Sequence, residues 1–591
     1  MSSTRPVFPV FVAGLLLAVG AASPQAPPTT LQSNATLVLV DVVVTNKGKP
    51  VLGLDQSQFR VREDGKEQTI TSFEEHKPAA APELPRRLPP DTYTNRPDYP
   101  DSATVNVLLL DALNTPMADQ MQARQQMLDY LKTLPPGSPI AIFTLASSLR
   151  IVQGPSADRS VLSAAIQGAA ANSRPSPVLD TTTDQALDAT ITDAANNGTS
   201  QQALGAMQQF EADNTAMQTD RRVRLTLQAM QQLARYCSGI PTRKNLIWFS
   251  GSFPLSLDSD PSLDSPLDAT RNYSEEIRET SHLLSAARVA VYPVDARGLL
   301  TLPMLDTNYS ESSSSNAAGS GGGPVGGGRR GTLASGMPGF AKDNLHSMKQ
   351  TQAEHSSMLQ VAMDTGGWAF LDTNGLQQAV ERIMQHGSNY YTLAYASSAK
   401  QRDGKFRKIE VRIDGAKYQL AYRDGYYADD PAKRFAFRSS EPSLVAAMVH
   451  QAPTASEVLF TVRALPSTAQ LSNSHEETRT ALTLPRKHYT VSFNVDPHGL
   501  DMNTLPDGSS RAQVEFVAIV YGRDGKQLNR SDTAFAFHLR AEQYAASMQH
   551  GIPHQVELDL PAGHLFLRVA VHDLSSNRIG STEFPLNVAA P

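Results

Sequence analysis

Between residues 104 and 388, short apolar runs alternate with stretches of helical periodicity. The run at 105–111 is almost entirely Val and Leu, ends in Asp111, and is too short for a helix. This pattern predicts a strand buried on both faces, with an acid at its carboxyl end. We expect Thr115 to cap the helix that follows and Pro116 to be its first residue. Further buried strands are expected at 140–145, 245–249 and 289–294. Strands separated by helices predict βαβ units, a mostly parallel sheet, and a ligand site at its carboxyl edge.

Two stretches interrupt this alternation. Residues 168–215 are poor in large apolar side chains and rich in Ala, Thr, Asn, Asp and Gln, which predicts a mobile insertion that is helical in part. Asp220 would then cap a helix over 223–237. Residues 310–340 are rich in Gly and Ser and predict a flexible loop. No Gly-Lys-Ser or Gly-Lys-Thr follows, so this loop is not a phosphate-binding loop.

The flanking segments have a β pattern instead. Residues 35–76 and 389–428 each contain a few short strands separated by turns, too few for either segment to bury a core alone. We expect the two to pair as one β-sandwich, with residues 104–388 inserted between them and the Pro-rich stretch 77–103 as a linker. Residues 455–590 alternate apolar and polar positions with regular turns, which predicts an immunoglobulin-like β-sandwich.

The N-terminus indicates export. Residues 1–23 resemble a signal peptide. Arg5 precedes an apolar run, and this run ends in small residues such as those that precede a cleavage site. After its cleavage no stretch is apolar enough to span a membrane, so we expect a periplasmic or extracellular protein of a bacterial envelope. The single cysteine, Cys237, cannot form an internal disulfide and falls on an apolar helix face. A net charge of -6 over 591 residues gives no reason to expect nucleic acid as a partner.

Motifs for catalysis are not found. The chain has no Gly-x-Ser-x-Gly, no His-Glu-x-x-His and no Cys/His pair close in sequence. We therefore expect a protein that is not an enzyme.

Several short sequence segments, which follow one another in the same order as in that family, resemble the von Willebrand factor A domain. The resemblance is strongest to its secreted bacterial branch, the VWFA-related family. The segments lie at 108–115, 243–251, 291–298, 365–367, 390–393 and 422–426, and the resemblance covers roughly residues 35–430. It implies an α/β fold with a doubly wound, mostly parallel, Rossmann-like sheet, here flanked by β-sandwich modules.

The resemblance also implies a metal-ion-dependent adhesion site that holds Mg²⁺, with Ca²⁺ or Mn²⁺ as alternatives. Asp111 matches the first ligand and Thr115 retains a hydroxyl, but Leu113 and Gly251 stand where the family has further ligands. The second-loop Thr is either Thr215 or Thr219. Other oxygen donors expected at the same sheet edge could complete the site. They are Asn114, Asp220, Ser250 and Asp295.

An alternative interpretation needs no metal. Asp111 would cap a helix N-terminus, and Asp295 would pair with Arg297 or another cation. Two functions follow from these patterns, and a hydrolase with an unrecognised site is a third, less favoured alternative. The first is an exported interaction or adhesion module that binds a protein or glycan at the sheet edge. The second is a structural component of a bacterial envelope complex.

Overall fold

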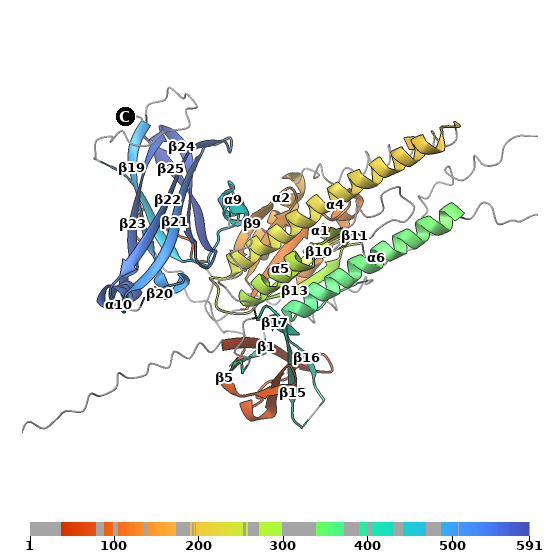
Figure 1. Cartoon of the computed structure of the whole chain (residues 1–591), viewed down its shortest axis with the longest axis horizontal. Helices are drawn as coiled ribbons and strands as arrows, with labels where there is room; N and C mark the ends of the chain where they lie inside the picture. Colours follow the sequence, from red (N-terminus) through yellow and green to blue (C-terminus); the bar gives the residue numbers. More distant parts are fainter. Residues whose placement is uncertain are drawn as a thin grey trace, which may run out of the picture.

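The computed structural model shows three units (Figure 1). It describes residues 37–77, 88–97, 104–133, 139–172, 190–191, 194, 197–251, 256–257, 271–297, 338–371, 389–398, 403–415, 417–428, 441–467, 486–505 and 507–589. An α/β unit lies at the centre. A small β unit that contains both N-terminal strands and strands after residue 389 lies below it in Figure 1, and a C-terminal β-sandwich lies to its left.

The central sheet has five strands in the order β13-β10-β7-β8-β9. They are β7 (Val105–Asp111), β8 (Ile140–Leu145), β9 (Leu149–Ser156), β10 (Lys244–Ser250) and β13 (Val289–Asp295). The first four in this order pair in parallel, whereas β9 runs antiparallel to β8 as the edge strand. All the other named strands pair antiparallel, so over the described chain the sheets are mostly antiparallel. The expected mostly parallel sheet therefore applies to this unit alone.

Helices pack on both faces of the central sheet. They are α1 (Met117–Thr133) and α2 (Arg159–Asn172) on one face, and α4 (Gln201–Cys237), α5 (Ser274–Ala286) and α6 (Pro338–Thr365) on the other. Side chains alternate along β7, so Val107 and Leu109 join the core under α4 while Leu108 and Leu110 join the core under α1. Every residue of β7 is consequently buried. A two-stranded ribbon of β11 (Ser256–Leu257) and β12 (Arg271–Asn272) accompanies this unit.

Several expected helix boundaries are wrong. Helix α1 begins at Met117, after Thr115 and Pro116, and the backbone oxygen of Pro116 accepts from the Gln120 amide. Helix α4 begins at residue 201, inside the expected insertion 168–215, with Ser200 as its N-cap; Asp220 therefore lies within the helix and does not cap it. The polar first half of α4 extends beyond the sheet (Figure 1), where no apolar stripe is needed, so apolar periodicity could not reveal it.

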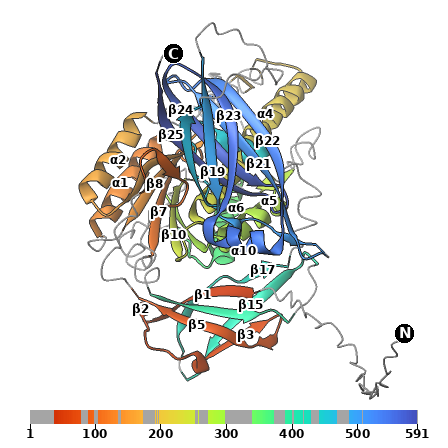
Figure 2. The ribbon, with the colours of Figure 1, turned by 90° about the vertical axis from the view of Figure 1, so that its left-hand side faces the viewer.

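The small β unit joins chain segments more than 300 residues apart. One sheet has the order β16-β1-β14-β5, with β2 beside β1, and the other has the order β17-β15-β3-β4. Val38–Val44 and Tyr391–Tyr395 share its core with Phe59 and Val411. Figure 2 shows the N-terminal and later strands interleaved. The strands are β1 (Leu37–Asn46), β2 (Lys49–Pro50), β3 (Phe59–Glu63), β4 (Lys66–Gln68), β5 (Ile70–His76), β14 (Tyr390–Ala396), β15 (Phe406–Ile413), β16 (Gln419–Ala421) and β17 (Gly425–Tyr427), with the 3-10 turn η1 (Gln56–Gln58).

The C-terminal unit packs two antiparallel sheets around one apolar core. The orders are β23-β19-β18-β6 and β20-β21-β24-β25, with β22 beside β21. The elements are β18 (Phe460–Pro466), β19 (Arg486–Val495), β20 (Asn503–Thr504), β21 (Ser510–Tyr521), β22 (Gln527–Leu539), β23 (Ile552–Pro561), β24 (Gly563–Asp573), β25 (Arg578–Val588), α9 (Glu441–Met448), α10 (Ala541–His550) and the 3-10 turn η6 (Pro497–Gly499).

Strand β6 (Thr92–Thr94) corrects the expected linker 77–103. It pairs with β18 of the C-terminal sandwich, and the ring of Tyr93 stacks on Phe584 with centroids 4.1 Å apart. The Asn95 amide donates to the backbone oxygens of Ala455 and Val458. Three strand residues are too few to show a period in the sequence, so only this packing identifies them.

The C-terminal sandwich is fixed to the end of α4. The buried guanidinium of Arg235 pairs with Glu457, whose carboxylate also accepts from the backbone N–H of Ile579. The Ser456 hydroxyl donates to the backbone oxygen of Tyr236 at 2.7 Å and accepts from the Gly239 N–H at 2.8 Å. These contacts hold the two units in one arrangement.

Among the described residues, no helix is long and apolar enough to cross a membrane. The expected signal peptide at 1–23 lies outside the described residues, as does the expected loop at 310–340 up to the start of α6.

Candidate functional site

Three of the expected ligands end neighbouring strands. Asp111, Ser250 and Asp295 are the last residues of β7, β10 and β13. Parallel pairing aligns Leu110 with Phe249 and Ser250 with Asp295, so the three residues lie side by side at the carboxyl edge of the sheet. The sequence therefore placed these three residues correctly on one edge.

The carboxylate of Asp111 is fully buried and accepts four hydrogen bonds. The backbone N–H of Asn114 donates to Oδ1 at 3.0 Å, and the Asn114 side-chain amide donates to Oδ2 at 2.8 Å. Oδ2 also accepts from the indole Nε1 of Trp248 at 3.0 Å and from the Ser250 hydroxyl at 2.9 Å. Burial raises the pKa of Asp111, and these hydrogen bonds offset only part of that effect.

The network continues from Asp111 to helix α4 and to the end of β10. The Asn114 side-chain amide also donates to the hydroxyl of Thr226 on α4, at 2.7 Å. The hydroxyl of Thr115 accepts from the Gly251 N–H at 2.9 Å. The loop after β7 is thus tied to both neighbouring elements. Thr115 performs this role in place of the helix-capping role that we expected.

Gly251 lies directly against the loop after β7. A Cβ atom built at this position would lie 3.0 Å from Cδ of Pro116 and 3.1 Å from Cα of Thr115. Few real Cβ atoms approach a neighbour so closely, so any side chain here would have to displace the loop.

The remaining expected ligands have other partners. Asp295 pairs with Arg297 through both carboxylate oxygens, at 3.1 and 3.0 Å, and lies 3.0 Å from Nε2 of His355. Arg297 also bonds Glu354, on α6, at 2.9 Å. Asp220 accepts from the Tyr273 hydroxyl and from Arg224, each at 2.9 Å. The alternative pairing of Asp295 with Arg297 is the one that the structure contains.

Two residues of the network, Trp248 and Thr226, were not predicted from the sequence. Trp248 lies two residues before Ser250, so both side chains are on the sheet face of Asp111. A buried indole N–H needs an acceptor, and this rule could have linked it to the acid on the next strand. Thr226, and not Thr215 or Thr219, is the threonine of α4 whose hydroxyl contacts the loop after β7. In the sequence it could have been noticed as a Thr on an otherwise apolar helix face.

The donor set does not fit a hard divalent cation. Such an ion needs about six oxygen ligands with lone pairs directed at it. Here N–H donors from Trp248 and Asn114 point at the carboxylate of Asp111, Ser250 donates its proton there, and Leu113 and Gly251 contribute no oxygen. Among the described residues, no three His, Cys, Asp or Glu side chains are placed to share an ion. The expected cation remains a prediction that this hydrogen-bond network does not favour.

No protein-family model matches the chain, and no curated protein matches it. Among solved structures, the chain is similar to an aerotolerance-related membrane protein from Bacteroides fragilis, at 10% identity over 48% of this chain and 98% of that one, with a TM-score of 0.25. It is similar to the conserved hypothetical protein BatB from Bacteroides thetaiotaomicron, at 10% identity over 47% and 95% with a TM-score of 0.21. It is also similar to a von Willebrand factor type A protein from Catenulispora acidiphila, at 9% identity over 63% and 76% with a TM-score of 0.17. These TM-scores are too low for the similar structures to indicate the function of this chain.

Proposed function

We propose that this chain is an exported, non-enzymatic interaction module with a von Willebrand factor A-like central unit. Its binding face is the carboxyl edge of the central sheet, and it binds a protein or glycan there without a divalent cation. The export step is supported by the pattern of the N-terminal residues.

The observation that carries this proposal is the Asp111 network. It joins the loop after β7, the end of β10 and helix α4 into one rigid edge through buried hydrogen bonds. In open α/β sheets ligands bind at this edge, on loops held by a rigid scaffold.

A cluster of charged groups lies beside that edge, with Asp295 and Glu354 buried and Arg297 partly exposed. Arg297, Asp295 and Glu354 form a linked pair of salt bridges at the end of β13. Asp119 lies near them; burial raises its pKa, the charge of Arg297 lowers it, and the charge of Asp295 raises it. Arg297 and Asp119 are the partly exposed members of this cluster, and charged groups within reach of a partner give specificity and on-rate to a protein interface.

A scaffold role is the second candidate. The buried pair Arg235–Glu457 and the pairing of β6 with β18 fix the C-terminal sandwich to the central unit. A rigid multi-unit chain suits a component of an envelope complex, in which the sandwich would set the spacing of the central unit.

The test is affinity capture from an envelope fraction with the full mature chain. Met121 lies one turn into α1 beside the edge and is 72% exposed, so Met121→Arg places a charge on the proposed face. Gln555→Arg, at an exposed position of β23, is the matched control. We expect a captured partner to be lost with Met121→Arg, kept with Gln555→Arg, and unaffected by a chelator.

Each other outcome contradicts part of the proposal. Loss on chelation would contradict cation-independent binding. Equal loss with both variants, or retention with Met121→Arg, would contradict the edge as the binding face. A stoichiometric complex that resists both variants would favour the scaffold role.

A further inference from the structure

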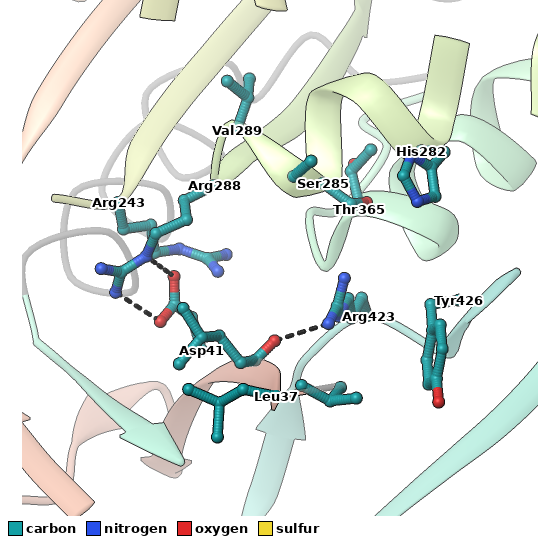
Figure 3. A pocket seen from close by; sticks show the side chains of 13 residues that line it. Leu37, Asp41, Arg243, His282, Ser285, Arg288, Val289, Thr365, Arg423 and Tyr426 are labelled. Atoms are coloured by element: carbon teal, nitrogen blue, oxygen red, sulfur yellow. Dashed lines mark hydrogen bonds and ion pairs between the residues drawn. The ribbon is translucent and has the colours of Figure 1, made fainter. Parts of the chain in front are cut away.

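A pocket of about 250 Å³ lies at the opposite end of the central sheet, where it meets the small β unit (Figure 3). Arg243 and Arg288 each immediately precede a strand, β10 and β13 respectively, so both lie at the amino edge of the sheet. The start of β1 forms another wall, and Arg423, which follows β16, closes a further side.

One of the three arginines is neutralised within the pocket. Arg288 binds Asp41 through both carboxylate oxygens, at 3.0 Å from Nε and 2.6 Å from Nη2 (Figure 3). Burial alone would raise the pKa of Asp41, but the charge and hydrogen bonds of Arg288, the charge of Arg243 and a hydrogen bond from Thr392 together hold this pKa below its usual value. This pair therefore contributes no net charge.

Neither of the other two arginines forms an ion pair with an acid in the part of the chain that the structure describes, although the charge of Asp41 acts on both. Arg243, which is 3% exposed, donates from Nη2 to the backbone oxygen of Gly366 at 2.7 Å and to the Tyr292 hydroxyl at 3.4 Å. Arg423 donates from Nη2 to the backbone oxygen of Leu39 at 2.6 Å. In each guanidinium the Nε atom is buried and makes no hydrogen bond in the described chain. A guanidinium has five N–H donors, so each has several unused.

The guanidinium of Arg243 and the backbone of Arg423 both approach Gly366. Its backbone oxygen accepts from Arg243, and a Cβ atom built on it would lie 2.8 Å from the backbone N of Arg423. With the Asp41–Arg288 pair neutral, the lining carries two uncompensated positive charges. Burial lowers the pKa of Arg423, and the charge of Asp41 offsets only part of this effect.

The rest of the wall is mixed, with His282, Ser285, Thr365 and Tyr426 as its polar members and an apolar part beside them. The apolar part includes Leu37, Leu39, Ala286 and Val289. A small-molecule site typically combines such an apolar wall with a few fixed polar groups. A pocket of about 250 Å³ has room for a small organic molecule.

We propose that this pocket binds a small organic dianion, a dicarboxylate of about four carbons, between the guanidinium groups of Arg243 and Arg423. Guanidinium groups bind carboxylates through paired, charge-assisted hydrogen bonds, and two such groups match two carboxylates. The apolar wall contacts the carbon chain. The site is independent of the carboxyl edge, so it stands or falls separately from the proposed interaction function.

The experiment is calorimetric titration of the full mature chain with succinate, inorganic phosphate and acetate. We expect saturable binding of succinate that is tighter than that of phosphate, which lacks a carbon chain, and of acetate, which has a single charge. Arg423→Gln is the main variant, because this side chain is partly exposed and we therefore expect the fold to tolerate its loss. It should weaken succinate binding at least about tenfold, since one charge-assisted hydrogen-bonding group is removed. Arg243→Gln should do the same.

Arg463→Gln, at an exposed position of β18, is the control and should bind succinate as the wild type does. A thermal melt of each variant verifies folding. The proposal is overturned by no saturable succinate binding at millimolar concentration, by phosphate or acetate binding as tightly, or by equal weakening in the Arg463→Gln control.

Discussion

Replacement of Asp111 by Ala tests the role of the hydrogen-bond network directly. The carboxylate is fully buried and accepts from two donors of Asn114, from Trp248 and from Ser250. After truncation the Ser250 hydroxyl can rotate to another acceptor, but the other three donors are fixed by the backbone, the indole and the bond to Thr226.

The magnitude follows from those three donors. Each buried donor without a partner costs about 1–3 kcal/mol, and relief from burying a carboxylate offsets part of the sum. We therefore expect Asp111→Ala to lower the free energy of unfolding of the central unit by about 3–5 kcal/mol. Asp129→Ala is the control, because this acid is half-exposed on α1 and pairs with Lys132 and Gln125 on the same helix, so it should cost less than about 1 kcal/mol.

Tryptophan fluorescence during urea unfolding reports on this unit selectively. The chain has two tryptophans. Trp248 is buried beside Asp111, whereas Trp368 is 59% exposed. In a Trp368→Phe background the remaining signal comes from the network itself. A loss below about 1 kcal/mol for Asp111→Ala would refute the claim that the network stabilises the edge.

The same unfolding assay, repeated over a range of pH, tests the protonation of Asp111. Because burial raises the pKa of Asp111 above its unfolded value, the folded state binds the proton more tightly than the unfolded state does. This group therefore costs stability at neutral pH, and the cost disappears as the pH falls through the folded pKa. The gap between wild type and Asp111→Ala should widen on acidification; a gap that narrows would contradict this sign.

Unfolding in the presence of a divalent cation distinguishes the hydrogen-bond network from a metal site. An ion that bound the folded state would stabilise it by about 2.7 kcal/mol at a hundred times its dissociation constant. We expect no change in the unfolding midpoint of the wild type with Mg²⁺, Mn²⁺ or Ca²⁺, relative to a chelator. A saturable rise that disappears in Asp111→Ala would restore the adhesion-site interpretation.

Three further predictions concern other parts of the chain. Gly251→Asp, which supplies the carboxylate expected in the family, should destabilise by about 1–3 kcal/mol because its Cβ meets Pro116, and should gain no Mg²⁺ binding by calorimetry. Glu457→Ala leaves Arg235 buried without its partner and should loosen the C-terminal sandwich by about 3–5 kcal/mol, seen as faster proteolysis at the junction. Burial lowers the pKa of Lys244 to about 8, so wild-type stability should rise relative to Lys244→Met as the pH increases from about 8 to 10.5.

Each of these has a matched control. Gly154→Asp meets no atom within 4 Å and should be tolerated; an equal loss would show that the contact at Gly251 is not the cause. Glu557→Ala removes an acid that is 48% exposed and should leave proteolysis unchanged. Lys132→Met, at a 71% exposed position, should show no such pH-dependent difference, and a flat difference for Lys244→Met would contradict its lowered pKa.

The sequence predicted the central strands because their side chains must be apolar on both faces. The run at 105–111 is a strand with every residue buried, and its terminal acid lies at the carboxyl edge as expected. Helix starts were predicted less well. Thr115 resembles a cap in sequence, but its hydroxyl accepts from Gly251, a partner 136 residues away that no local pattern can show.

The partners of the acids were equally hidden. Asp295 and Asp220 are plausible ligands by residue type, yet Arg297, His355, Tyr273 and Arg224 already contact them. The sequence supplied no reason to choose Thr226 over Thr215 or Thr219, because only the packing of α4 on the sheet decides which hydroxyl reaches Asn114.

The sequence by itself therefore determined the local features: which runs are buried strands, which segments turn, and which acids end strands. These depend on side-chain periodicity, a property of neighbouring residues. Only the tertiary structure decided that Asp111 is surrounded by hydrogen-bond donors, that residues 92–94 complete the distant sandwich, and that Arg243 and Arg423 face one pocket. Those features depend on contacts between residues far apart in the chain, which form only when burial of the apolar cores brings their elements together.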